Sequence, residues 1–187
     1  PIPEKYKEIR YSLCSIDFDK EKGTFGNRID TLIDAEKMKK SISFPRPSYD
    51  GKYIMFTLSD YGNFSIWHKE ADLWLLNLQD GSLRTIHEVN SDNTESFHNW
   101  SSNSHWFVFS SRREDGLYTR LYLACINKEG KVSKPFLLPQ KNPMNYYDKL
   151  LYSYNVPEFT NSPVKIEPRK LEREIVSNKR VQVEVRK

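Results

Sequence analysis

The chain has 187 residues, a formal net charge of +4 at pH 7, and 13% aromatic residues within a hydrophobic content of 37%. Aromatic side chains bury large apolar areas and favour strands, which excludes a disordered chain despite 29% charged residues. The positive charge is weak and dispersed, unlike that of a nucleic-acid-binding domain, and no apolar run approaches the roughly 20 residues that span a bilayer. We therefore expect a globular domain with no nucleic-acid partner and no membrane span.

The first 40 residues contain an apolar segment followed by a polar turn. Residues 11–18 read Tyr-Ser-Leu-Cys-Ser-Ile-Asp-Phe, and the turn covers residues 19–24. This combination recurs twice later in the chain, so we interpret residues 1–40 as the outer half of a repeated unit, closed by a short helical turn near residues 35–40. Cys14 and Cys125 lie in apolar runs without metal-ligand or redox spacing, which predicts two buried thiols.

A sequence repeat occupies the middle of the chain. Residues 44–57 read FPRPSYDGKYIMFT, and residues 97–110 read FHNWSSNSHWFVFS. A second apolar strand with a turn follows each copy, at residues 73–82 and 121–130. Self-similarity with a period of about 40 to 50 residues and several strands per unit is typical of β-propeller blades.

Two complete four-stranded units are predicted. The first spans residues 41–89, with strands at 41–45, 52–58, 72–78 and 83–88; the second spans residues 90–139, with strands at 96–100, 105–111, 119–126 and 132–138. Their second strands contain solid apolar runs, as expected of strands buried on both faces. The predicted fold class is all-β: antiparallel four-stranded propeller blades, two complete and one partial. The propeller is incomplete, because such rings close with typically four to eight blades.

The tail, residues 140–187, differs from the repeat. Residues 142–147 and 155–157 combine Asn and Pro and predict extended or turning chain. A helix is predicted over about residues 168–178, with Pro168 in its first turn. Residues 181–185 alternate as Val-Gln-Val-Glu-Val, which predicts a terminal strand.

The repeat resembles the TolB-type, WD-like β-propeller repeat. The resemblance is carried by Ser48-Tyr-Asp-Gly-Lys-Tyr-Ile-Met-Phe56 and Trp100-Ser-Ser-Asn-Ser-His-Trp-Phe-Val-Phe-Ser-Ser-Arg112, followed by Leu73-Trp74 and Leu121-Tyr122. Other turn-forming residues replace the usual Trp-Ser-Pro-Asp and Pro-Asp-Gly in the two copies. Residues 41–139 are similar to uncharacterised envelope proteins of Bacteroides-type bacteria, which implies a periplasmic or cell-envelope location. Such propellers serve transport, scaffolding, peptidase and lyase proteins alike, so the fold does not fix the function.

Loop lengths distinguish the two rims of the predicted blades. The turns at residues 47–51, 79–82, 101–104 and 127–131 are tight, whereas the loops at 59–71, 87–95 and 112–118 are long. We call the end that carries the long loops the long-loop rim. Long loops on a rigid scaffold are the usual seat of binding. The candidate binding residues on this rim are Asp60, Tyr61, Trp67, His68, Glu70, Arg112, Arg113 and Tyr118.

A metal site is a second interpretation. Imidazole and carboxylate groups of His68, Glu70 and His98 suit a metal ion, although no short ligand spacing joins them. The segment from His98 to Ser101 is also reminiscent of propeller lyases that act on uronate oligosaccharides. The competing interpretation is structural: the aromatic and imidazole rings pack within the loops, and the arginines bond to acidic residues of neighbouring loops.

The chain contains neither the Gly-x-Ser-x-Gly elbow of hydrolases nor a glycine-rich phosphate loop, and we expect no cofactor. We therefore expect a non-enzymatic binding or scaffolding module of a bacterial cell envelope, with a protein or glycan ligand at the long-loop rim. The alternative is the propeller domain of a metal-assisted polysaccharide lyase or a prolyl-oligopeptidase-like hydrolase with its catalytic parts outside this chain. The rest of a longer chain, or a second copy, is expected to supply the missing blades.

Overall fold

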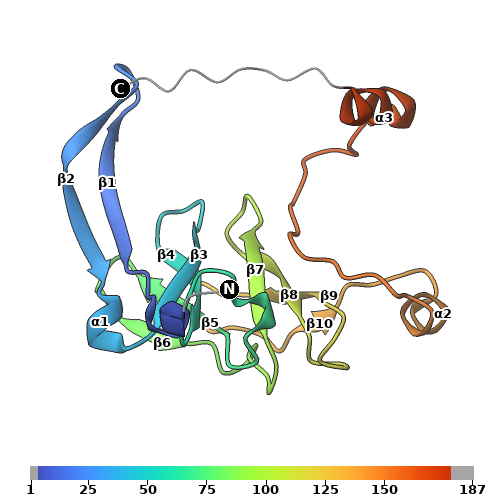
Figure 1. Ribbon diagram of the computed structural model, residues 1–187, viewed down its shortest axis with the longest axis horizontal. Helices are drawn as coiled ribbons and strands as arrows, with labels where there is room; N and C mark the ends of the chain where they lie inside the picture. The colour runs from blue at the N-terminus through green and yellow to red at the C-terminus, as the bar shows by residue number, and fades with distance from the viewer. Residues whose placement is uncertain (1–3, 178–187) are drawn as a thin grey trace.

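The structure, a computed structural model, describes residues 4–177 and consists mainly of three antiparallel sheets that follow one another along the chain (Figure 1). A hairpin comes first, formed by β1 (Leu13–Asp19) and β2 (Thr24–Ile33). The first four-stranded sheet contains β3 (Ser41–Pro47), β4 (Tyr53–Ser59), β5 (Asp72–Asn77) and β6 (Leu83–Thr85). The second contains β7 (Glu95–Trp100), β8 (Trp106–Ser111), β9 (Arg120–Cys125) and β10 (Phe136–Leu137).

Each four-stranded sheet is a meander in which every strand pairs antiparallel with its neighbours in sequence. This arrangement is that of a propeller blade, and the predicted all-β fold with two complete four-stranded blades is confirmed. Within residues 4–177 the sheets do not close into a ring, as expected of an incomplete propeller. We refer to β3–β6 as the first blade and to β7–β10 as the second blade.

Helices are few and short. They are the 3-10 helices η1 (Glu4–Glu8) and η2 (Ser65–Trp67) and the α-helices α1 (Ala35–Met38), α2 (Pro143–Asp148) and α3 (Pro168–Val176). The helical turn expected near residues 35–40 and the helix expected near residues 168–178 are therefore confirmed. Among residues 4–177, no helix is both long enough and apolar enough to cross a membrane.

The main core lies between the two blades. The first blade contributes Met55, Leu73 and Leu75, and the second contributes Trp100, Phe107 and Phe109. On the opposite face of the first blade, Phe56 and Leu58 belong to a second cluster with Leu13 and Ile33 at the base of the hairpin. Both faces of β4 are thus buried, which explains its continuous apolar sequence.

The first strands of the two blades, β3 and β7, contain the same irregularity. A β-bulge interrupts each ladder, near residues 44–45 and 97–98. Phe44 and Phe97 adopt left-handed backbones there, with φ of 52° and 45°, a conformation that is unusual for bulky residues. Their rings lie 4.7 Å apart between centroids, so the two bulges meet through an aromatic contact between the blades.

The tight turns that follow these strands are also built alike. A serine hydroxyl, from Ser48 or Ser101, accepts a hydrogen bond from the backbone N–H five residues later, in both cases at 3.0 Å. Gly51 and Ser104 occupy the same left-handed position, with φ of 71° and 58°. Ser104 Oγ also accepts a bond of 2.9 Å from the backbone N–H of Asp50, so the turns of adjacent blades are joined.

Two local predictions were wrong. Residues 142–147, expected to be extended or turning, lead into and form most of α2: Asn142 caps the helix and Pro143 lies in its first turn. The same residues that suggest a turn therefore start a helix.

The second wrong prediction concerns the cysteines. Cys14, expected to be buried, is exposed on the projecting hairpin, and Cys125 is half-buried; both thiols are free. The strand expected at residues 181–185 lies outside the described residues.

The core between the blades yields a first prediction. Trp100 is fully buried, and its indole N–H donates a bond of 3.0 Å to the carbonyl oxygen of Arg46 in the first blade. Trp100→Ala should lower the free energy of unfolding by about 3–5 kcal/mol, because it removes this contact and leaves a cavity. Urea unfolding measures the change. Tyr49→Ala, at an exposed turn, should change it by less than about 0.5 kcal/mol, and equal effects would contradict the prediction.

Candidate functional site

The structure brings the three long loops together at one end of the blades. The backbone N–H of Glu95 donates to the carbonyl oxygen of Ala71 at 2.8 Å, and that of Arg112 donates to the carbonyl oxygen of Thr94 at 3.1 Å. The Thr94 hydroxyl in turn donates to the carbonyl oxygen of His68 at 2.7 Å. These hydrogen bonds join all three loops of the long-loop rim, so residues that are distant in sequence share one surface.

Trp67 stands out on this surface. It is the last residue of η2, whose other two residues, Ser65 and Ile66, are buried and anchor the loop. The guanidinium carbon of Arg112 lies 3.6 Å from the centroid of the Trp67 ring, in cation–π contact. Trp67 is 67% exposed, whereas Arg112 is only 6% exposed. The indole is therefore an exposed flat surface that a buried cation supports from one side.

Arg112 has an unusual environment for a buried arginine. It makes no ion pair within the described part of the chain, and its buried Nε has no hydrogen-bond partner there. Burial lowers the pKa of Arg112 from its usual value, while the negative charge of Asp115 opposes this shift. The group remains charged at neutral pH, because the ordinary arginine pKa is so high. Positive charge therefore lies directly behind the Trp67 ring.

Arg113, the next residue, points in a different direction. Its guanidinium donates to the buried carboxylate of Glu95 at 3.0 Å and to the carbonyl oxygen of Val89 at 2.6 Å, and it lies 4.4 Å from the Tyr122 ring centroid. Burial raises the pKa of Glu95, and hydrogen bonds from two serine hydroxyls and the nearby guanidinium oppose this shift. Arg113 thus holds loops of the two blades together, as the structural interpretation expects for these arginines.

Four further candidates form a connected group. His68 Nδ1 lies 3.2 Å from Glu70 Oε1, and the Tyr61 and His68 ring centroids are 4.3 Å apart. Glu70 Oε1 also accepts a bond from the backbone N–H of Asp60 at 3.3 Å, and the Asp60 carboxylate pairs with Lys40. This group belongs to the same loop as Trp67, so much of the predicted set lies on one loop.

The remaining candidates lie elsewhere. Tyr118 is half-buried, with the Arg120 guanidinium 5.4 Å from its ring centroid. His98 is buried between the blades, where its Nε2 lies 2.9 Å from the carbonyl oxygen of Met55. It does not join His68 and Glu70, so the three candidate metal ligands are not assembled. No group of three His, Cys, Asp or Glu side chains in residues 4–177 is placed to hold a metal ion.

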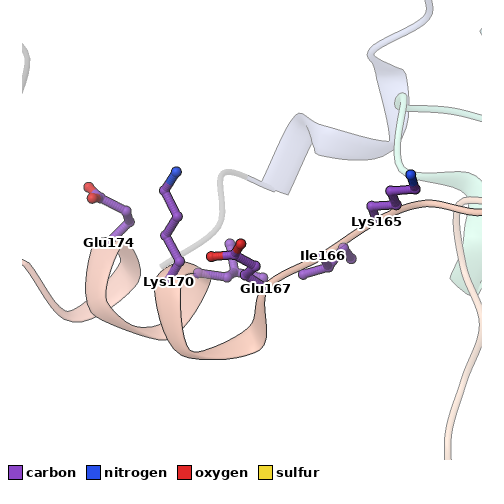
Figure 2. A pocket seen from close by; sticks show the side chains of 6 residues that line it. Lys165, Ile166, Glu167, Lys170 and Glu174 are labelled. Carbon is purple, nitrogen blue, oxygen red and sulfur yellow. The ribbon is translucent and has the colours of Figure 1, made fainter.

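Two surface hollows were missed by the sequence analysis. One, of about 560 Å³, lies beside the long-loop rim and is lined by Lys69, Glu70, Asp72, Ser91 and Asp92. Burial raises the pKa of Asp72 in this hollow. The other, of about 430 Å³, is formed in the tail by α3 and the segment before it (Figure 2). Neither combines an aromatic surface with charge, because both are lined by short or flexible side chains.

Comparisons with known proteins add little to this description. No protein-family model matches the chain, and no curated protein matches it. A solved structure that resembles it is the β-propeller domain of the Trilobed protease from Pyrococcus furiosus, described as having an open velcro topology. The TM-score is 0.38 and the sequence identity 17%, over 68% of this chain and 35% of that chain. The chain thus spans about a third of that structure, and a similarity this low says nothing about activity.

The buried histidine yields a second prediction. Burial lowers the pKa of His98 from 6.5 to about 4. As pH falls below 6.5 the unfolded chain takes up a proton that the folded protein accepts only near pH 4, so stability is lost over this interval. The loss should reach about 3 kcal/mol, since each unit of pKa difference corresponds to about 1.4 kcal/mol. Urea unfolding between about pH 7 and pH 4 measures it.

Two histidine variants separate this effect from other titrations. His98→Gln cannot take up the proton and should lose this part of the pH dependence. His87→Gln, at an exposed position, should keep it. Identical pH profiles for the two variants would show that another group causes the loss.

Proposed function

We propose that the protein is a non-enzymatic binding or scaffolding module of a bacterial cell envelope, and that it binds its ligand through the long-loop rim. The observation that carries the proposal is the pair formed by Trp67 and Arg112. A large aromatic surface is exposed to solvent although the two residues directly before it, Ser65 and Ile66, are buried and anchor the loop. The envelope location rests on the resemblance of the repeat.

The physical argument concerns the cost of binding. Trp and Arg dominate binding hot spots because they bury large areas and give directed interactions. A side chain that is already held in place loses little conformational freedom when a ligand covers it. The cation–π contact and the buried residues of η2 hold Trp67 in this way. Covering the free face of the indole then gains apolar contact at a small entropic cost.

The chemistry of the surface favours two classes of ligand. A flat indole accommodates the apolar face of a sugar ring or an apolar side chain of a protein. The positive charge of Arg112 behind the ring and the acidic hollow beside it give this surface charges of both signs. We therefore propose a protein or glycan ligand that contacts Trp67 with an apolar face.

Arrays of oligosaccharides and of peptides, probed with the labelled protein, test the proposal. Trp67→Ala should weaken the strongest signals at least about tenfold, since hot-spot residues contribute about 1.4 kcal/mol or more. Its thermal stability should stay close to that of the wild type, because the side chain is largely exposed.

Tyr49→Ala is the matched control. Tyr49 is 69% exposed, nearly the same as Trp67, but lies at a tight turn on the opposite rim. It should bind the array as the wild type does. The proposal fails if Trp67→Ala binds normally, or if Trp67→Ala and Tyr49→Ala weaken binding equally.

A further inference from the structure

Backbone hydrogen bonds of one kind join the hairpin to the first blade, the first blade to the second, and the second blade to the tail. The three bonds run from Ile42 N–H to the Tyr11 oxygen at 2.9 Å, from Glu95 N–H to the Ala71 oxygen at 2.8 Å, and from Tyr154 N–H to the Thr119 oxygen at 3.2 Å. In the second of these, the acceptor directly precedes the third strand of one blade, and the donor begins the first strand of the next. The other two bonds extend this pattern to the hairpin on one side and to the tail on the other.

The hairpin occupies the place of a half blade. Tyr11 lies just before β1, as Ala71 lies before β5, so β1 and β2 correspond to the third and fourth strands of a blade. Leu13 supports this correspondence, because it packs against the first blade as Leu73 packs against the second. The partial blade inferred from sequence therefore has a defined place in the series.

The tail occupies the place of a first strand. Residues 154–158 lie along the second blade, where the Ser110 hydroxyl donates to the carbonyl oxygen of Tyr154 at 2.9 Å. Pro157 is buried, as His98 is at the corresponding position of β7. The Glu158 carboxylate accepts a hydrogen bond from the Asn99 side chain and lies 3.5 Å from the Arg46 guanidinium. The segment therefore lies where the first strand of a further blade would lie, although it is not itself part of a sheet.

The hairpin has one apolar face and one charged face. On the apolar face, Ile16 is opposite Ile29 and Phe18 is opposite Phe25, with the last two ring centroids 5.1 Å apart. All four of these side chains are exposed. The alternate positions of β1 carry Ser15, Asp17 and Asp19. Leu13 faces the first blade, and side chains alternate along a strand. Cys14, Ile16 and Phe18 therefore lie on the opposite face, which points away from the first blade.

The outer face of the second blade is also apolar and is partly exposed, although Val108 on this face is buried. By alternation with Phe107 and Phe109, which face the first blade, Trp106 and Val108 point outward. Their ladder partners Cys125 and Leu123 share that face, and Phe136 lies beside Leu123. Trp106 is 40% exposed and Phe136 is 41% exposed. The corresponding residues of the first blade, such as Met55 and Leu75, are completely covered by the second blade.

We propose that this outer face of the second blade binds the apolar face of the β1–β2 hairpin of a second copy of the chain. In this contact, sheets of two copies stack on each other in the same way as the sheets within one copy do. The tail of one copy then lies at the place of a first strand, and the hairpin of the other lies at the place of the third and fourth strands. The charged hairpin face stays in water, which favours this orientation over its reverse.

The proposed contact is head to tail. Each copy uses one surface on its second blade and a different one on its hairpin, so every pair leaves one surface of each kind free. Assembly can therefore continue beyond a dimer. Contacts between two hairpins or between two second blades would be symmetric instead, and they would stop at two copies.

Light scattering after size exclusion, over a range of concentrations, tests the proposal with two variants of the full chain. Phe18→Glu blocks the hairpin face, and Trp106→Glu blocks the blade face. Wild-type protein should associate as its concentration rises, whereas each variant alone should remain monomeric. An equimolar mixture of the two variants should form heterodimers, because each retains the face that the other has lost. Tyr49→Glu, on neither face, should associate as the wild type does.

Other outcomes overturn the proposal. They are a wild-type chain that remains monomeric, a mixture that remains monomeric, or a single variant that still associates. If Trp106→Glu fails to fold, which circular dichroism would show, Phe136→Glu replaces it on the same face. A bifunctional thiol reagent gives a second readout in the wild type. It should link the hairpin Cys14 of one copy to the Cys125 of another, whereas covalent dimers linked only through Cys14 pairs would contradict the contact.

Discussion

The packing of one apolar sheet face on another is the interaction on which the rest of this structure depends. The first blade is stable only because the second covers Met55 and Leu75, and because the base of the hairpin covers its other face. Sheets that bury both faces need continuous apolar strands, and the tight turns that join them need Gly or a small polar residue in a left-handed backbone. The repeat supplies both, and the bulges and turns of the two blades match because they meet the same constraint.

The turns at one end of the stacked blades and the loops at the other end are under different structural constraints. Serine hydroxyls fix two of the tight turns at one end. The long loops at the other end carry side chains that the core does not require. Some of those side chains serve the stack itself: Arg113 pairs with the buried Glu95, whose carboxylate would otherwise have no counter-charge. Trp67 serves no such purpose, since most of its surface faces water. The contrast between these two residues separates structural support from a candidate binding surface.

The stack also has ends. Residues on the outer face of the second blade are chemically similar to those that the first blade buries, yet they are partly exposed. The hairpin presents a second apolar surface of this kind, and an isolated two-stranded hairpin gains little stability by itself. These surfaces follow from the same constraint as the core, because each sheet is built to be covered on both faces. Association between copies is one way to satisfy it.

The sequence by itself determined the two blades, the first three strands of each, their turns, and the division of the loops into a short set and a long set. It could do so because hydrophobic periodicity and turn-forming residues are local features of the sequence, and the same pattern occurs in both copies of the repeat. The fourth strands, β6 and β10, are shorter than the predicted strands at residues 83–88 and 132–138. The sequence could not distinguish Arg112 from Arg113: adjacent arginines differ only in which neighbours the folded loops bring to them, a buried carboxylate for one and an indole ring for the other. It likewise placed His98 with His68 among the metal candidates, and could not show that Cys14 is exposed, because burial depends on which surfaces meet. Those assignments were decided by the tertiary structure alone, since they depend on contacts between residues far apart in the chain.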